Sequence, residues 1–329
     1  MVGSERFSDL STSLRSRSGD GGRRRRAMTQ AMESWVRQMI EALGSKGRRP
    51  GPLDLYVRPD SGGGLVDAER VFFSGLQLSN GTFKTTSERR LDDVNQFVSD
   101  LLPRGSHLEI IDVAVSSGVA TAEWSEHLLA VGIEHRITAS DLAPEAVLLT
   151  VGERAAILWQ TDGHPLAVQV GSRCLYLDRS RRSTALLNAP LRQLFELFRA
   201  LGIGSIRRVP LVSRRLAGLP GQRVVRDDIA EPGRFIGEFD VCRAANILNR
   251  EYFADREIES MAQNLLARLS EGGLLIVCRS IEEGGVNLNR ATVVRKTMDG
   301  GKVVARLNGG ADVEDLLLGA GVTSVAAAH

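Results

Sequence analysis

In the middle of the chain, hydrophobic residues alternate between a helical periodicity and short continuous apolar runs. Apolar residues three and four positions apart predict an amphipathic helix that begins at Ser87 and ends near Leu102. A short apolar run over 108–115 predicts a buried strand, a helix is expected over about 120–131, and a second strand over 137–141. A strand, a turn of small residues, a helix and a strand in this order are typical of a βαβ unit with parallel strands.

The same alternation returns in the last third of the chain. An amphipathic helix is expected over 255–269, ended by Gly272-Gly273, and a hairpin over 291–307 turns at Asp299-Gly300-Gly301. Further strands are expected at 223–229, 239–246 and 274–278. The pattern predicts an α/β protein that closes with an antiparallel pair.

The stretch 146–222 interrupts this pattern and is expected to be an insertion. Two extended segments, 156–161 and 166–177, meet at Asp162-Gly163, a dipeptide that favours a hairpin turn. A strong helix is expected over 186–201. The segment is longer than a usual connection between a strand and a helix, so we interpret it as an insertion or a helical cover.

The N-terminal part differs in composition from the rest. Residues 1–52 hold 11 basic and 5 acidic residues, which leaves 31 basic and 35 acidic residues for the rest of the chain. We expect a basic flexible leader over 1–52 with one amphipathic helix at 27–43, an extension over 53–86, and the main domain over 87–329. The basic tail is either a solvated leader or a contact for an anionic surface.

Composition excludes several classes of protein. With 329 residues, 43% hydrophobic and 25% charged, the chain is typical of globular proteins. No apolar run approaches the roughly 20 residues that cross a bilayer, so no integral membrane segment is expected. Three scattered cysteines indicate a reduced, cytoplasmic location rather than a disulfide framework. The five histidines lack metal-binding spacing, so no metal site is expected, and nucleic acid is not the expected partner of the folded body.

Candidate chemistry gathers at the ends of the predicted parallel strands. The sequence Asp112-x-Ala114-x-Ser116-x-Gly118 places small residues where the first strand turns into a helix, so backbone N–H groups can approach a ligand. Asp141 ends the second strand, where a carboxylate can accept both hydroxyls of a ribose. Asp228 ends the next strand and could meet the exocyclic amine of an adenine. This constellation suits a nucleoside.

The arrangement resembles class I S-adenosylmethionine-dependent methyltransferases. Their first motif reads acidic-x-Gly-x-Gly-x-Gly, and here Ala114 and Ser116 replace two of its glycines. Asp141 falls at the ribose-binding acid, and the passage from Phe239 to the hairpin matches the later strands. The resemblance covers about 87–145 and 223–310. It implies a Rossmann-like, doubly wound, seven-stranded mixed sheet with an antiparallel terminal hairpin.

The resemblance also implies a function. We expect methyl transfer from S-adenosylmethionine to a small molecule or a protein side chain, by in-line displacement that needs no catalytic triad. Two alternatives stay open: a non-catalytic binding module that keeps the fold, and, less favoured, a nicotinamide-dependent oxidoreductase, which lacks its G-x-G-x-x-G motif here. The expected cofactor contacts are Asp112, Ala114, Ser116, Gly118, Asp141, Leu142, Asp228, Ile229 and Asn246.

Three further residues are candidates for the substrate side. Arg243 either meets an anionic substrate or pairs with an acidic neighbour. Tyr252 and His164 either line the acceptor pocket or lie in ordinary turns. Each carboxylate above also has an alternative role as a helix cap at the end of its strand.

Overall fold

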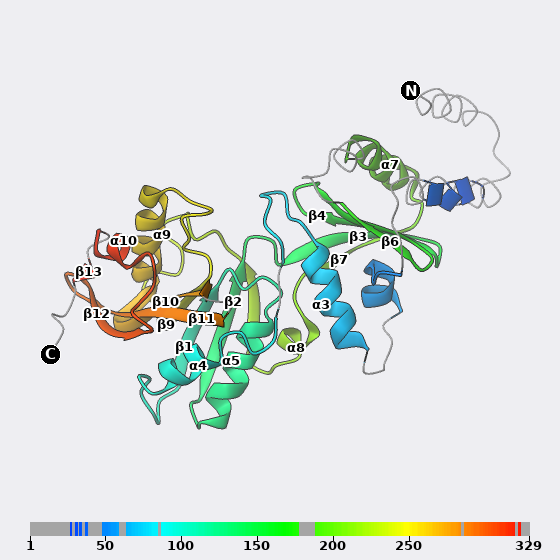
Figure 1. Cartoon of the computed structure of the whole chain (residues 1–329). Helices are drawn as coiled ribbons and strands as arrows, with labels where there is room; N and C mark the ends of the chain where they lie inside the picture. Colours follow the sequence, from blue (N-terminus) through cyan, green and yellow to red (C-terminus); the bar gives the residue numbers. More distant parts are fainter. Residues whose placement is uncertain are drawn as a thin grey trace.

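The fold consists of two β-sheets with helices packed on both faces of each (Figure 1). This computed structural model describes residues 48–58, 64–84, 87–177, 188–283, 286–319 and 322–323, with single residues between 27 and 38. Most of the basic leader, including most of its expected helix, lies outside the described residues.

The larger sheet combines parallel and antiparallel strands. In spatial order it runs β13 (Val322–Thr323), β12 (Gly300–Leu307), β11 (Val286–Thr297), β10 (Leu269–Glu283), β9 (Phe239–Ala245), β1 (Leu108–Val113), β2 (His135–Asp141) and β8 (Arg223–Arg226). Strands β8, β2, β1, β9 and β10 are mutually parallel, and β10, β11 and β12 form antiparallel pairs. This confirms the expected α/β mixed sheet with its terminal hairpin; the two-residue β13 adds an eighth strand.

Helices cover both faces of this sheet, as a doubly wound fold requires. Because successive side chains of a strand point to opposite faces, Ile110 packs toward α4 (Asp92–Ser99) and α5 (Val119–Ala130), and Ile111 packs toward α9 (Asp255–Arg268) and α10 (Glu314–Gly319). The two cores therefore lie on opposite sides of the same strands.

The smaller sheet is built from the expected insertion. It contains β6 (Arg173–Tyr176), β5 (Pro165–Val170), β4 (Ala155–Gln160), β3 (Glu145–Val151) and β7 (Ser205–Pro210), all paired antiparallel. Helix α7 (Asn188–Leu201) covers one face, and the short α8 (Arg214–Ala217) follows β7. The hairpin at Asp162-Gly163 is confirmed. The extended segment expected over 166–177 is instead two strands, because Gly171 turns the chain with φ +60°.

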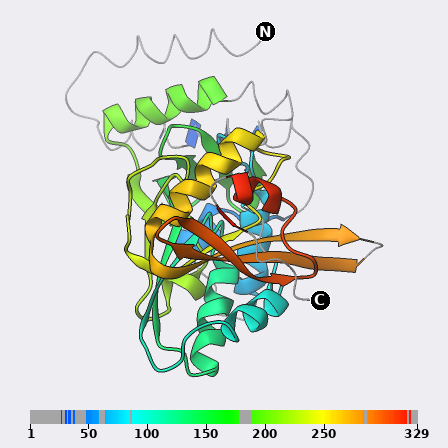
Figure 2. The same ribbon diagram turned by 90° about the vertical axis from the view of Figure 1, so that its left-hand side faces the viewer.

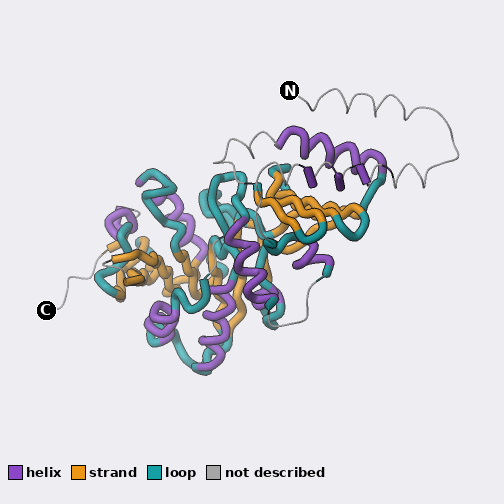
Figure 3. Tube along the Cα trace, turned by 45° about the vertical axis from the view of Figure 1, so that its right-hand side comes forward, coloured by secondary structure: helices purple, strands orange, loops and turns teal. Residues whose placement is uncertain are grey.

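The N-terminal extension covers the other face of the smaller sheet (Figure 3). A π-helix, η2 (Leu53–Val57), and the helix α3 (Leu65–Gly75) bury Leu55 and Phe72 against strands β3, β4 and β5. The chain then turns at the Gln77–Phe83 bridge and reaches the larger sheet at Lys84. The extension therefore connects the two sheets.

One helix begins later than the sequence pattern predicts. The helix expected from Ser87 starts at Asp92, because Arg89 adopts a left-handed conformation (φ +57°) and its N–H donates to the Glu123 carboxylate instead of continuing a helix. Ser87 therefore caps no helix and is exposed beside the β1–α5 turn. Strands β10 and β11 are longer than expected and form the hairpin that extends from the body in Figure 2.

Candidate functional site

The turn between β1 and α5 keeps the backbone shape that glycines would adopt. Ala114, Ser116 and Gly118 all have positive φ, at 55°, 58° and 75°. A residue with a Cβ in this region is destabilised by about 1 kcal/mol. A Cβ on Gly118 would lie 2.3 Å from the Leu216 side chain, which packs on the turn from α8. The turn is therefore covered by the insertion.

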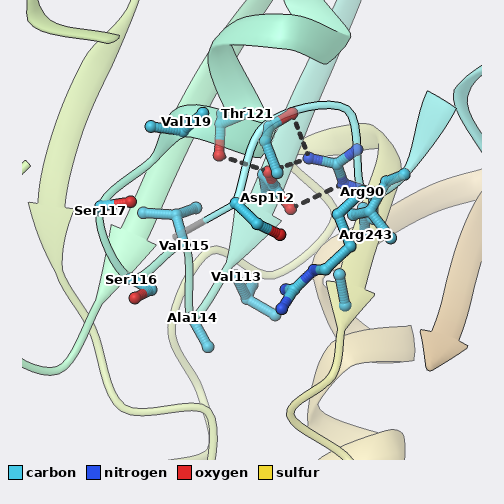
Figure 4. Close-up of a pocket in the computed structure, with 14 residues that line it drawn as sticks. Arg90, Asp112, Val113, Ala114, Val115, Ser116, Ser117, Val119, Thr121 and Arg243 are labelled. Carbon is cyan, nitrogen blue, oxygen red and sulfur yellow. Dashed lines mark hydrogen bonds and ion pairs between the residues drawn. The ribbon is translucent and has the colours of Figure 1, made fainter. Parts of the chain in front are cut away.

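Asp112, expected beside the cofactor, is bound by another side chain of the chain. Its Oδ1 accepts a hydrogen bond from Arg243 Nε at 3.0 Å, and its Oδ2 accepts bonds from Arg243 Nη2 at 2.5 Å and from the Thr121 hydroxyl at 2.7 Å. Both residues are at most 2% exposed, and the guanidinium lies 4.1 Å from the centre of the Trp124 ring. Figure 4 shows these bonds below the start of α5. Of the two roles open for Arg243, the structure shows the pairing with an acidic neighbour.

Asp141, expected to bind a ribose, is also occupied. Lys84 Nζ donates to its Oδ1 at 3.1 Å and to the Ser116 carbonyl at 3.0 Å. The backbone N–H groups of Ser116 and Ala143 donate to the two carboxylate oxygens at 2.8 and 2.9 Å. Lys84 is 1% exposed, and burial lowers its pKa while Asp141 raises it. A buried ammonium therefore stands where the ribose hydroxyls were expected.

The strand end expected at the adenine has two acids with different surroundings. Asp227 is buried, and its Oδ2 accepts bonds from Arg268 at 2.5 Å and from the Ser140 hydroxyl at 3.1 Å. The neighbouring Asp228 is half-buried and caps its own turn through the Ala230 N–H. Ile229 packs in the core beside α9. Asp228 is thus the acid at this strand end that holds no ion pair among the described contacts.

Asn246 and Leu142 lie at the carboxyl ends of β9 and β2. Asn246 adopts φ +61°, and its side-chain oxygen accepts a bond from the Ser280 N–H, while its Nδ2 is buried without a partner in the described residues. Leu142 is exposed. Both remain candidates for a ligand contact.

Tyr252 and His164 do not line the cavity at the β1–α5 turn. Tyr252 is 58% exposed and contacts the Phe253 ring. His164 lies in the β4–β5 turn of the smaller sheet, where its carbonyl accepts the Gln160 N–H. Trp159 and Phe198 pack in the core between the smaller sheet and α7.

The cavity at the turn is narrow in this conformation. The cavity lined by Asp112, Ser116, Arg243 and their neighbours has a volume of about 40 Å³. Pockets that hold drug-sized ligands measure roughly 300–1,000 Å³. Two of the three expected acids, Asp112 and Asp141, already hold cations of the chain, and Leu216 covers the turn. In this conformation, side chains of the chain itself contact Asp112, Asp141 and the turn, where the cofactor was expected.

Comparisons with known proteins give a likeness of fold. No model of a protein family and no curated protein matches the chain. Solved structures that resemble it include the CMeT domain of citrinin polyketide synthase (14% identity, TM-score 0.31), phosphoethanolamine N-methyltransferase 1 of Haemonchus contortus (12%, 0.30) and the [4+2]-cyclase SpnF (15%, 0.28). Each match covers 59% of this chain, and 36%, 26% and 47% of the other chains respectively. The likeness is one of fold alone.

The sheet itself carries the fold assignment. Its parallel order β8-β2-β1-β9-β10, followed by an antiparallel pair, is the Rossmann-like arrangement that the resemblance to class I methyltransferases implies. Within the described ranges, no group of His, Cys, Asp and Glu side chains is placed to hold a metal, and no helix has the length and apolarity to span a membrane.

Sequence reasoning missed the residues that fill the site. Lys84 follows a stretch without helical or strand periodicity, and Leu216 lies in an irregular part of the insertion. Arg90 falls within the helix predicted to begin at Ser87, yet it lies before α4 and its side chain lines the cavity. The signal that was available is compositional: two motif glycines are replaced, which indicates that the backbone need not admit a ligand closely.

Proposed function

We propose that this protein is a non-catalytic binding module built on a methyltransferase-type α/β fold. The observation that carries the proposal is the buried bond from Lys84 to Asp141, the carboxylate expected at the ribose. Lys84 comes from the N-terminal extension, and both side chains are less than 10% exposed. The chain thus supplies its own cation at the position where an adenosyl ligand would need a free carboxylate.

The contacts at Asp141 oppose the entry of an adenosine. Releasing Lys84 from Asp141 costs about 1–3 kcal/mol, because the carboxylate keeps two backbone N–H donors. Hydrogen bonds from a ligand to a charged carboxylate return about 1.5–3 kcal/mol each in net free energy, and part of this gain offsets the loss of Lys84. The ligand would in addition have to displace Leu216 from the turn. Binding an adenosine at Asp141 is therefore opposed by the fold's own contacts.

Calorimetric titration tests the proposal. With S-adenosylmethionine, S-adenosylhomocysteine and NAD, we expect no saturable heat up to about 1 mM ligand, which corresponds to a binding free energy weaker than about −4 kcal/mol. The same titration is run on Lys84→Met, which removes the buried cation from Asp141. Its matched control is Lys302→Met, which removes an exposed lysine from β12. Micromolar binding of S-adenosylhomocysteine by the unaltered chain would contradict the proposal.

The second candidate is S-adenosylmethionine-dependent methyl transfer to a small molecule or a protein side chain. It is supported by the left-handed turn at Ala114, Ser116 and Gly118, and by Asp228 and Asn246, which hold no ion pair among the described contacts. It requires Lys84 to leave Asp141. Under this candidate, Asp141→Asn weakens nucleoside binding by about 2–3 kcal/mol; under the binding module, it changes nothing in the titration.

A further inference from the structure

The cavity at the β1–α5 turn is lined by a cation, Arg90, that has no counter-charge among the described residues. Arg90 lies just before α4, is partly buried, and lines the cavity together with Ser87 and the turn. In Figure 4 the bonded guanidinium is that of Arg243, and the other, without a dashed line, is that of Arg90. No described residue gives the Arg90 side chain a hydrogen bond or an ion pair.

The charges around this cavity do not cancel. Arg243 is neutralised by Asp112, and Lys84 by Asp141. Arg90 is the remaining cation of the lining, and burial and the nearby Arg243 both lower its pKa. A partly buried charge without a partner is costly, so a fold that keeps one is stabilised by an anion that enters from solvent.

The lining suits one particular anion. A guanidinium offers two parallel N–H donors that match the two oxygens of a carboxylate. The hydroxyl-bearing residues Ser87, Ser116 and Ser117 also line the cavity, and Ser87 is exposed at its rim. A volume of about 40 Å³ admits a group of a few atoms.

We propose that this cavity binds a small monocarboxylate on Arg90. The single uncompensated positive charge matches a monoanion, and the planar group matches the guanidinium better than a tetrahedral dianion does. The inference rests on the proposed function, because it names the ligand class of a module that does not bind an adenosyl group.

Thermal unfolding in sodium acetate tests the proposal. At matched ionic strength, acetate is compared with sodium chloride and sodium sulfate. At about ten times its dissociation constant, acetate is expected to raise the Tm by about 2–4 °C over chloride. Sulfate is expected to give less than half of this shift.

Two neighbouring arginines provide matched variants. Arg90→Gln is expected to lose the acetate shift, whereas Arg89→Gln, which removes an exposed arginine paired with Asp92, is expected to keep it. Arg90→Lys keeps the charge but not the fork of donors, and is expected to lose at least half of the shift. This variant provides the test if Arg90→Gln does not fold.

The outcomes separate this inference from the proposed function. Equal shifts with acetate, chloride and sulfate, or an undiminished acetate shift in both Arg90 variants, would overturn the carboxylate site. S-adenosylhomocysteine is included as a fourth ligand. If it raises the Tm of the unaltered chain, the non-catalytic module is wrong, and the acetate results still decide whether Arg90 binds a carboxylate.

Discussion

Asp112 and Asp141 end adjacent parallel strands, but their cations come from different places. Arg243 lies on β9, directly opposite Asp112 in the register of the same sheet. Lys84 comes from the segment that covers the smaller sheet and reaches Asp141 from outside. The first ion pair is therefore part of the larger sheet, and the second holds two packed regions together.

The two ion pairs therefore differ in which part of the molecule must move to release them. Both members of the Asp112–Arg243 pair lie on paired strands of the larger sheet. The Asp141–Lys84 pair can be released by moving the N-terminal extension while the larger sheet stays intact. A ligand that binds Asp141 itself must therefore displace Lys84.

The largest expected effect comes from Arg243→Met. It leaves Asp112 buried without its cation, so the free energy of unfolding is expected to fall by about 3–5 kcal/mol in urea denaturation. Arg136→Met removes an exposed pair with Glu109 and should cost less than about 1 kcal/mol. Similar losses in the free energy of unfolding of the two variants would show that the buried ion pair stabilises the fold no more than the exposed pair does.

The cover of the turn is tested next by Leu216→Ala. Leu216 is fully buried against Gly118, and its truncation is expected to cost about 2–4 kcal/mol. The matched change Leu197→Ala removes a leucine of α7 that is 37% exposed and should cost less. An equal loss in urea denaturation would mean that α8 is not packed on the turn.

Lys84→Met is expected to cost less than Arg243→Met, about 1–3 kcal/mol, because Asp141 keeps two backbone N–H donors. The double variant Lys84→Met/Asp141→Asn is expected to recover part of this loss, since no charge then stays unpaired. Strict additivity of the two single changes in a double-mutant cycle would contradict the ion pair.

The smallest expected effect is the pH dependence of stability that comes from His135 on β2. Burial lowers the pKa of His135 below its ordinary value of 6.5. The unfolded chain therefore takes up a proton before the folded chain does, so stability is full above pH 6.5 and falls as the pH drops below it. His135→Gln should flatten this slope in urea denaturation between pH 7 and 5, and an unchanged slope would assign it to another group.

The sequence predicted the framework better than the site. Periodicity located β1, α5, β2, α9 and the terminal hairpin because each buries a continuous apolar face. The smaller sheet was recognised only as an insertion with a hairpin at Asp162-Gly163. Its pairing of β3 with β7 joins residues about sixty positions apart, which local pattern does not encode.

Asp112 and Asp141 lie at the carboxyl ends of β1 and β2 as expected, whereas β8 ends at Arg226, two residues before Asp228. The partners of Asp112 and Asp141 were harder to predict. Asp141 and Lys84 are separated by 57 positions, and no spacing rule connects a lysine in an irregular segment to that carboxylate. For Arg243 the pairing with an acid was one of two open roles, because a single sequence does not show which residues face each other across strands. Side-chain partners depend on packing of distant elements.

The adjacency of β1 and β9 has a consequence for how the chain reaches its native state. These neighbouring strands are joined through contacts 131 positions apart, such as that of Arg243 with Asp112. Closing so long a loop is slow, whereas the hairpins of the smaller sheet need only local encounters. During synthesis the smaller sheet can therefore form early, whereas β1 pairs with β9 only after β9 has left the ribosome.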